Sequence, residues 1–123
     1  MQIISPDIVI RGENAWKKSL PEILKISKFP LVLGKSQITR NLRSQISNDL
    51  NHLNLKVYNC ELKFDCCEND LIRIYNLAIE HKCDSIISAG GGKVLDAGKL
   101  LAEYLSVPCI TVPLSASTCA GWT

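Results

Sequence analysis

Hydrophobic residues follow two patterns along this chain, short apolar runs and longer stretches in which apolar residues recur every three or four positions. The short runs predict strands at residues 7–12, 30–34, 55–60, 84–89 and 108–113. The longer stretches predict helices at residues 15–27, 37–52, 68–81 and 93–105. Strands that alternate with helices of this length indicate an α/β fold, with a parallel sheet formed by right-handed crossovers. We therefore expect one domain with helices on both faces of the sheet.

The stretch from 37 to 52 carries the clearest helical pattern. Its apolar positions are Ile38, Leu42, Ile46, Leu50 and the following Leu53. Arg40, Arg43, Asn48 and Asp49 fall on other faces of this helix. In the preceding helix, the basic segment Trp16, Lys17 and Lys18 is interpreted as a solvated face.

Composition restricts the class of protein. The chain has 123 residues, 46% of them hydrophobic, which is enough to form a core. Its 14 basic and 12 acidic residues are interspersed and give a net charge of +2, which argues against a nucleic-acid partner. No apolar run approaches the roughly 20 residues that span a bilayer, and the N-terminus lacks an export signal. We expect a cytoplasmic protein without a membrane partner.

The six cysteines are then interpreted as reduced thiols. Cys60, Cys83 and Cys109 adjoin predicted strands and are expected as small core residues. The pair Cys66 and Cys67 has neither the spacing of a redox motif nor a second pair of metal ligands. His52 and His81 lie near predicted helix ends without companion ligands, so no metal site is predicted in this chain.

Three consecutive glycines, Gly90, Gly91 and Gly92, separate a predicted strand from a predicted helix. A glycine-rich turn at a helix start exposes backbone N–H groups to an anion such as phosphate, and the helix dipole favours that charge. Lys93 opposes the dipole unless an anion is present, whereas Asp96 suits it. Taken alone, the triplet is equally consistent with a simple tight turn.

Two further turns follow strands at the same edge of the predicted sheet, where ligands of such folds bind. The turn after residue 34 reads Gly-Lys-Ser, but Phe29 stands where a phosphate-binding P-loop needs a glycine. The turn after residue 113 supplies the hydroxyl groups of Ser115, Ser117 and Thr118. Hydroxyl groups here fit a second wall of a nucleotide site, although they also occur in ordinary turns.

Two of these motifs together resemble the iron-containing alcohol dehydrogenase superfamily, most closely its glycerol dehydrogenase branch. The chain reads GGGKVLDAGK and, after LLAEYLSVP, CITVPLSAST. The branch pattern is Gly-Gly-Gly-Lys-x-x-Asp-x-Ala-Lys followed by Pro-Thr-x-Ala-Ser-Thr-Asp. The segments VIRGENAWKKSL, LVLG and CCENDLIR are similar to the same family's N-terminal half, so the resemblance covers nearly the whole chain.

The resemblance implies a Rossmann-like nicotinamide dinucleotide-binding domain over residues 1–123, ahead of a helical metal-binding domain. Gly90, Gly91, Gly92, Lys93 and Asp96 would hold the pyrophosphate and nicotinamide side of NAD or NADP. Leu114, Ser115, Ser117 and Thr118 would line the adenosine and ribose side. The family transfers hydride between a secondary alcohol or polyol and the cofactor, with a divalent metal, zinc or iron, polarising the alcohol oxygen.

This sequence departs from the branch pattern at three positions. Lys35 replaces an aspartate that would bind the adenosine ribose, and a cation there would suit the 2′-phosphate of NADP. Cys119 replaces an aspartate expected to touch substrate, so glycerol itself is not implied. Gly98 replaces an alanine, which costs helix stability and permits closer packing on the sheet.

The family's metal ligands, an aspartate and two histidines, would lie beyond Thr123, so this chain alone is expected to lack turnover. We expect the full-length enzyme to act on a small-molecule alcohol and to form a homo-oligomer. A sugar-phosphate cyclase of the dehydroquinate synthase type shares the glycine-rich turn, but its following Gly-Gly-Lys pattern is missing. A non-catalytic nucleotide-binding or self-associating module is a third interpretation, because an incomplete sheet exposes an edge.

Overall fold

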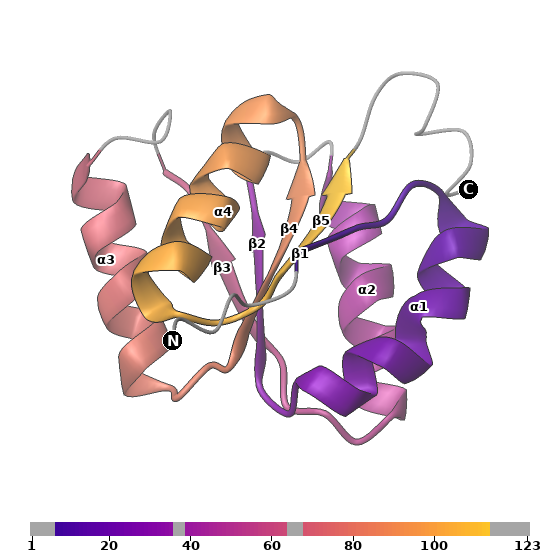
Figure 1. Ribbon diagram of the computed structural model, residues 1–123. Coiled ribbons are helices and arrows are strands. Elements are labelled where there is room, and N and C mark those ends of the chain that lie inside the picture. Colours follow the sequence, from indigo (N-terminus) through magenta and orange to yellow (C-terminus); the bar gives the residue numbers. More distant parts are fainter. Residues whose placement is uncertain (1–6, 36–38, 64–67, 114–123) are drawn as a thin grey trace.

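The computed structural model describes residues 7–35, 39–63 and 68–113 of the chain, which form a three-layer α/β domain (Figure 1). The strands are β1 (Asp7–Val9), β2 (Pro30–Gly34), β3 (Tyr58–Glu61), β4 (Ser85–Gly90) and β5 (Cys109–Pro113). The helices are α1 (Glu13–Ile26), α2 (Arg40–His52), α3 (Glu68–Glu80) and α4 (Gly92–Leu105). Each predicted strand and helix is present, with boundaries that differ by a few residues.

The described strands form one parallel sheet in the order β1-β5-β4-β2-β3. Two boundaries differ from the sequence expectation for local reasons. β1 stops at Val9 because Gly12, at φ +88°, turns the chain into α1. β3 begins only at Tyr58, since Asn54, at φ 65°, first reverses the chain after α2.

Two apolar clusters lie on opposite faces of the sheet. One joins α1 and α2 to the sheet through Trp16, Ile46, Val32 and Ile87. The other joins α3 and α4 to the opposite face through residues such as Ile74. The alternation of side chains along each strand produces this division, because neighbouring residues point to opposite faces. The predicted α/β fold with helices on both faces is therefore confirmed.

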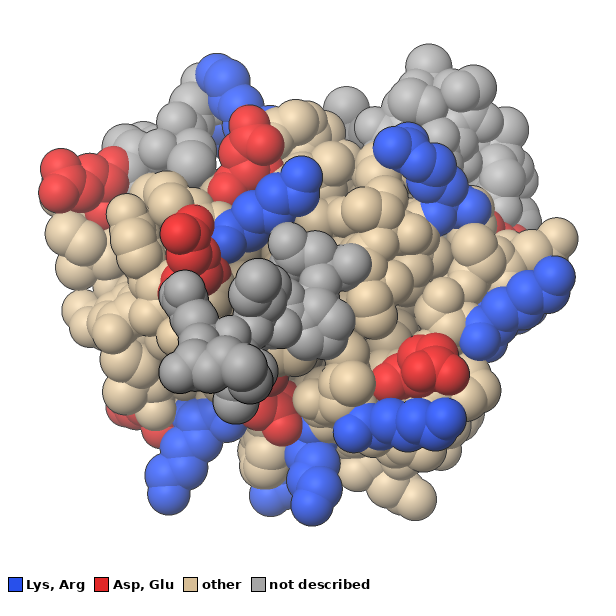
Figure 2. Space-filling view, viewed as in Figure 1, with Lys and Arg blue, Asp and Glu red and all other residues tan. Residues whose placement is uncertain are grey.

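The prediction of a solvated face at Trp16, Lys17 and Lys18 is correct for the two lysines and wrong for the tryptophan. Trp16 is fully buried and its indole Nε1 donates a 2.8 Å hydrogen bond to Asp49 Oδ2 of α2. Lys17 and Lys18 are exposed, as expected. Figure 2 shows basic and acidic side chains interspersed over the face in view. Among the helices in the described part of the chain, none is long and apolar enough to span a bilayer.

Candidate functional site

The glycine-rich turn lies where the winding direction of the sheet changes. β2 and β4 are neighbours, but α2, which follows β2, packs on one face and α4, which follows β4, packs on the other (Figure 1). Ligands of open parallel sheets bind at such a switch point, beyond the carboxyl ends of the strands. The turns after β2 and β4 are therefore the segments best placed to contact a ligand.

The three glycines of the turn after β4 differ in whether the backbone conformation at their position requires a glycine. Gly90 has φ +147°, a conformation that residues with a Cβ rarely adopt, so the tight turn itself needs this glycine. Gly91 has an ordinary φ of −84°, and a Cβ at Gly91 or Gly92 would meet no described heavy atom within 4 Å. Neither backbone conformation nor packing against the described residues requires a glycine at these two exposed positions, and among those residues nothing covers their backbone.

The start of α4 suits an anion. Gly91 is the N-cap residue and carries no side chain to accept from the first N–H groups of the helix, while its carbonyl accepts Leu95 N at 3.1 Å. The first N–H groups of a helix have no intrahelical acceptor, and the helix dipole adds partial positive charge to them. Lys93 is exposed in this first turn, so a cation and outward-directed amides lie together.

Asp96 and Gly98 occupy different faces of α4. Asp96 is exposed and makes no hydrogen bond or ion pair with any residue that the structure describes. Gly98 is buried against Ser88 of β4, where an added Cβ would come within 2.5 Å of the serine Cβ and Oγ. The closer packing expected from glycine at this position is therefore seen.

The turn after β2 contacts the glycine-rich turn. Lys35 is half-buried directly after β2, and its carbonyl accepts a 3.1 Å hydrogen bond from Thr39 Oγ1. The Thr39 methyl carbon would lie 3.6 Å from a Cβ at Gly90. Lys35 and Gly90 thus lie at the same edge of the sheet, because β2 and β4 pair in parallel.

The predicted third wall of the site lies outside the described residues. Its members are Leu114, Ser115, Ser117, Thr118 and the substrate-contact candidate Cys119. The strand that precedes them is described to its end, and Pro113 of β5 pairs with Gly90 of β4. The chain therefore leaves β5 immediately beside the glycine-rich turn.

Arg43 is the functional candidate that sequence reasoning missed. It was assigned to a face of α2 away from the core, but its side chain is 7% exposed and crosses Gly34, where a Cβ would overlap it. Arg43 Nε donates to Thr39 Oγ1 at 3.0 Å, and Nη1 lies 3.7 Å from Glu61 Oε1. One feature of the sequence pointed to this site: Arg40 and Arg43 stand three residues apart at the start of α2, and the first turn of that helix contains no acidic residue.

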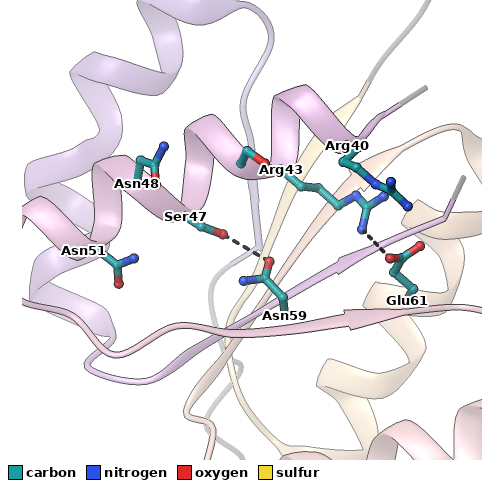
Figure 3. Close-up of a pocket in the computed structure, with 8 residues that line it drawn as sticks. Arg40, Arg43, Ser47, Asn48, Asn51, Asn59 and Glu61 are labelled. Carbon is teal, nitrogen blue, oxygen red and sulfur yellow. Dashed lines mark hydrogen bonds and ion pairs between the residues drawn. The ribbon is translucent and has the colours of Figure 1, made fainter. Parts of the chain in front are cut away.

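Arg43 points into a polar pocket of about 440 Å³ between α2 and β3 (Figure 3). Ser47 Oγ of α2 donates to Asn59 Oδ1 of β3 at 3.0 Å and closes one part of it. The described residues lining the pocket are Arg40, Arg43, Ser44, Ser47, Asn48, Asn51, Asn59 and Glu61. Two cations and one carboxylate give this pocket a positive balance at the carboxyl end of β3.

The described cysteines and histidines have no evident part in this site. Cys60 and Cys109 are buried, and Cys83 is half-buried with its pKa raised to about 11 by burial and the nearby Asp84 carboxylate. Cys66 and Cys67 lie outside the described residues. His81 stacks on Tyr58, with ring centroids 4.0 Å apart. Within residues 7–35, 39–63 and 68–113, no three His, Cys, Asp or Glu side chains gather where they could hold a metal.

The chain is similar in sequence to known oxidoreductases. The chain is 32% identical over 120 residues to an uncharacterized oxidoreductase of Synechocystis sp., an alignment that covers 98% of this chain and 31% of that protein. It is 31% identical over 117 residues to an Escherichia coli glycerol dehydrogenase, covering 94% of this chain and 32% of the relative. This chain therefore spans about a third of the length of these relatives.

The fold of this chain also matches about a third of the length of solved structures. The crystal structure of glycerol dehydrogenase from Schizosaccharomyces pombe superposes with a TM-score of 0.74 at 22% identity, covering 92% of this chain and 29% of the other. The family model for iron-containing alcohol dehydrogenase matches residues 6–123. The model match thus extends over both the glycine-rich turn and the segment after β5, and the chain belongs to the iron-containing alcohol dehydrogenase family.

Proposed function

We propose that residues 1–123 form the nicotinamide dinucleotide-binding part of a metal-dependent alcohol or polyol oxidoreductase. The observation that carries the proposal is the pair Gly91 and Gly92, whose exposed backbone at the uncapped start of α4 fits a pyrophosphate at the switch point. The similarity to a glycerol dehydrogenase supports a polyol-type alcohol as substrate of the complete enzyme.

Each element of the site has a stated task in this proposal. The first N–H groups of α4 bind the pyrophosphate, and Lys93 adds a positive charge beside it. Asp96, one turn further along α4, lies on the nicotinamide side of the cofactor. From the family resemblance, Leu114, Ser115, Ser117 and Thr118 are assigned to the adenosine side and Cys119 to the substrate; these residues lie outside the described part of the chain.

NAD or NADP held at the start of α4 would supply the hydride-transfer chemistry toward a secondary alcohol. The described residues offer no ligand set for a metal, so they do not fit the zinc or iron implied by the family. We assign this chain the binding and orientation of the cofactor and no metal-assisted step. Its activity is expected only in a longer, homo-oligomeric protein that supplies the metal ligands.

Fluorescence titration of the 123-residue chain with NADH and NADPH tests the proposal. Circular dichroism first establishes that the sample is folded. We expect saturable binding of at least one reduced cofactor, with a shift of its emission on transfer from water to the site. A folded chain that binds neither cofactor would exclude the proposed function.

A further inference from the structure

Helix α4 lies against β4 at two places where a glycine takes the position of a side chain. At the start of the helix, Val94 packs over Gly90, and a Cβ at Gly90 would lie 3.5 Å from the Val94 side chain. Near the middle of the helix, a Cβ at Gly98 would lie 2.5 Å from the Ser88 side chain and 3.6 Å from that of Ile86. The helix therefore rests on the strand through its first turn and again further along its length.

The connection between the two elements is very short. β4 ends at Gly90 and α4 begins at Gly92, so only Gly91 lies between them. From Gly92 to Gly98 the helix axis rises by about 9 Å. Because the connection holds the start of the helix, a displacement of α4 at Gly98 tilts the helix about its start. Such a tilt redirects the N–H groups of the first turn.

Ser88 occupies the space opposite Gly98. Its side chain is fully buried, and its Oγ has no hydrogen-bond partner among the described residues. A buried hydroxyl without a partner costs free energy, so hydrogen bonding within the described residues does not favour a serine here. The serine and the glycine are complementary in size, because a Cβ at position 98 would meet both the Cβ and the Oγ of Ser88.

On the basis of the proposed function, we propose that Gly98 and Ser88 are positioning residues for the cofactor, because their contact sets the distance of α4 from β4 and thereby directs the first N–H groups of α4 toward the pyrophosphate. Both residues are buried beneath the helix and do not touch the cofactor themselves. An alanine at position 98 has to move the helix by about 1 Å to restore an ordinary carbon–carbon contact of about 3.5 Å. Hydrogen bonds to an anion weaken steeply with changes in distance and angle.

Fluorescence titration of the folded 123-residue chain and its variants with NADH and NADPH tests the positioning role. Gly98→Ala should weaken the binding of whichever cofactor the wild-type chain binds by at least about tenfold. Ser88→Gly alone should leave the affinity close to that of the wild type. Combined with Gly98→Ala it should restore the affinity, because it removes both atoms that the alanine would meet. A merely structural contact would change stability without this loss and recovery of affinity.

Lys99→Gly is the matched control in the same helix. Lys99 is exposed, so the glycine lowers the helix propensity of α4 without changing its contact with β4. Its charge lies about 10 Å along the axis from the helix start and is largely screened at about 0.15 M salt. Cofactor affinity should therefore be unchanged. A loss as large as that caused by Gly98→Ala would show that helix stability controls the affinity, and would overturn the proposal.

The amide chemical shifts of Gly91, Gly92 and Lys93 provide a second readout in the cofactor-free chain. They should change in Gly98→Ala and return toward the wild-type values in the double variant. Circular dichroism establishes that each variant is folded. If Gly98→Ala is not, Ser88→Thr takes its place, since it adds a methyl group to the same buried contact from the side of the strand and should also weaken binding.

Two results would overturn the positioning role and leave the proposed function intact. One is wild-type affinity in folded Gly98→Ala, with unchanged amide shifts at the start of α4. The other is a loss of affinity that Ser88→Gly does not reverse. Binding of neither cofactor by the folded wild-type chain would overturn both the positioning role and the proposed function.

Discussion

Gly98 of α4 lies directly on Ser88 of β4, so closely that a Cβ on the glycine would come within 2.5 Å of the serine Oγ. This contact brings the helix against the strand that ends in the glycine-rich turn. Ser88 Oγ is buried and has no hydrogen-bond partner among the described residues. The contact therefore depends on the small size of position 98 and on the shape of the serine side chain.

We expect Gly98→Ala to lower the free energy of unfolding by about 1–2 kcal/mol. Alanine gains about 1 kcal/mol of helix propensity over glycine, but overpacking a buried site costs up to about 3 kcal/mol, and two atoms at 2.5 Å place this site in the upper part of that range, at about 2–3 kcal/mol. Urea denaturation of the wild-type chain and the variant measures the difference. An unchanged or increased stability would show that the helix can move away from Ser88 at no cost.

A double-mutant cycle identifies the contact responsible for this loss. Ser88→Gly removes the atoms that an alanine at position 98 would meet. In the Ser88→Gly background, Gly98→Ala should therefore be neutral or stabilising, with a coupling energy of about 1 kcal/mol or more. Additive effects of the two substitutions would locate the strain elsewhere.

Gly91→Val tests access to the backbone at the start of α4. The Gly91 backbone is extended and a Cβ there would meet no described atom, so stability should change by less than about 1 kcal/mol. The side chain would obstruct an anion at the first N–H groups, and cofactor affinity should fall by at least about tenfold. Asn14→Val, at an exposed position in the first turn of α1, is the matched control and should bind cofactor normally.

Asp49→Ala should destabilise the packing of α1 on α2. Trp16 is fully buried and its indole N–H donates to Asp49 Oδ2 at 2.8 Å, so the substitution leaves a buried donor unpaired. We expect a loss of about 1–3 kcal/mol, measured by thermal or urea unfolding. In a Trp16→Phe background, which has no indole donor, Asp49→Ala should have little further effect.

Cys83 should react slowly with iodoacetamide in the folded chain. Burial, with a smaller contribution from Asp84, raises the pKa of the Cys83 thiol from 9.0 to about 11, and the thiolate is the reactive form. Its alkylation rate, followed by peptide mass spectrometry, should rise tenfold per pH unit from pH 7 to 10 without levelling off. In urea-unfolded chain the rate should level off near pH 9, and the same plateau in the folded chain would contradict the raised pKa.

The raised pKa of Cys83 also makes the free energy of unfolding depend on pH. Between about pH 9 and 11 the unfolded chain releases the Cys83 proton while the folded chain retains it. The contribution of this thiol to the free energy of unfolding is therefore fully present below pH 9 and decreases as the pH rises toward 11. Cys83→Ser should flatten this part of a stability profile measured against pH.

The sequence by itself determined the order of strands and helices, because the spacing of apolar residues depends only on the local geometry of each element. Pro30–Gly34 is a strand with the predicted bounds, and α4 begins within one residue of its predicted start. The glycine-rich motif likewise placed a candidate anion site at the end of β4. These features require no knowledge of distant contacts.

Tertiary structure decided which polar residues lie together. Arg43 belongs to α2 and Glu61 to β3, and only the packing of that helix on the sheet brings them to 3.7 Å. Trp16 stands next to two lysines in the sequence, yet it is fully buried in the apolar cluster between α1, α2 and the sheet, where it bonds Asp49. Periodicity reports which face of a helix is apolar, but it cannot show whether an arginine is covered by a neighbouring strand. The sequence therefore did not reveal the polar pocket between α2 and β3, whereas it showed the glycine-rich turn directly.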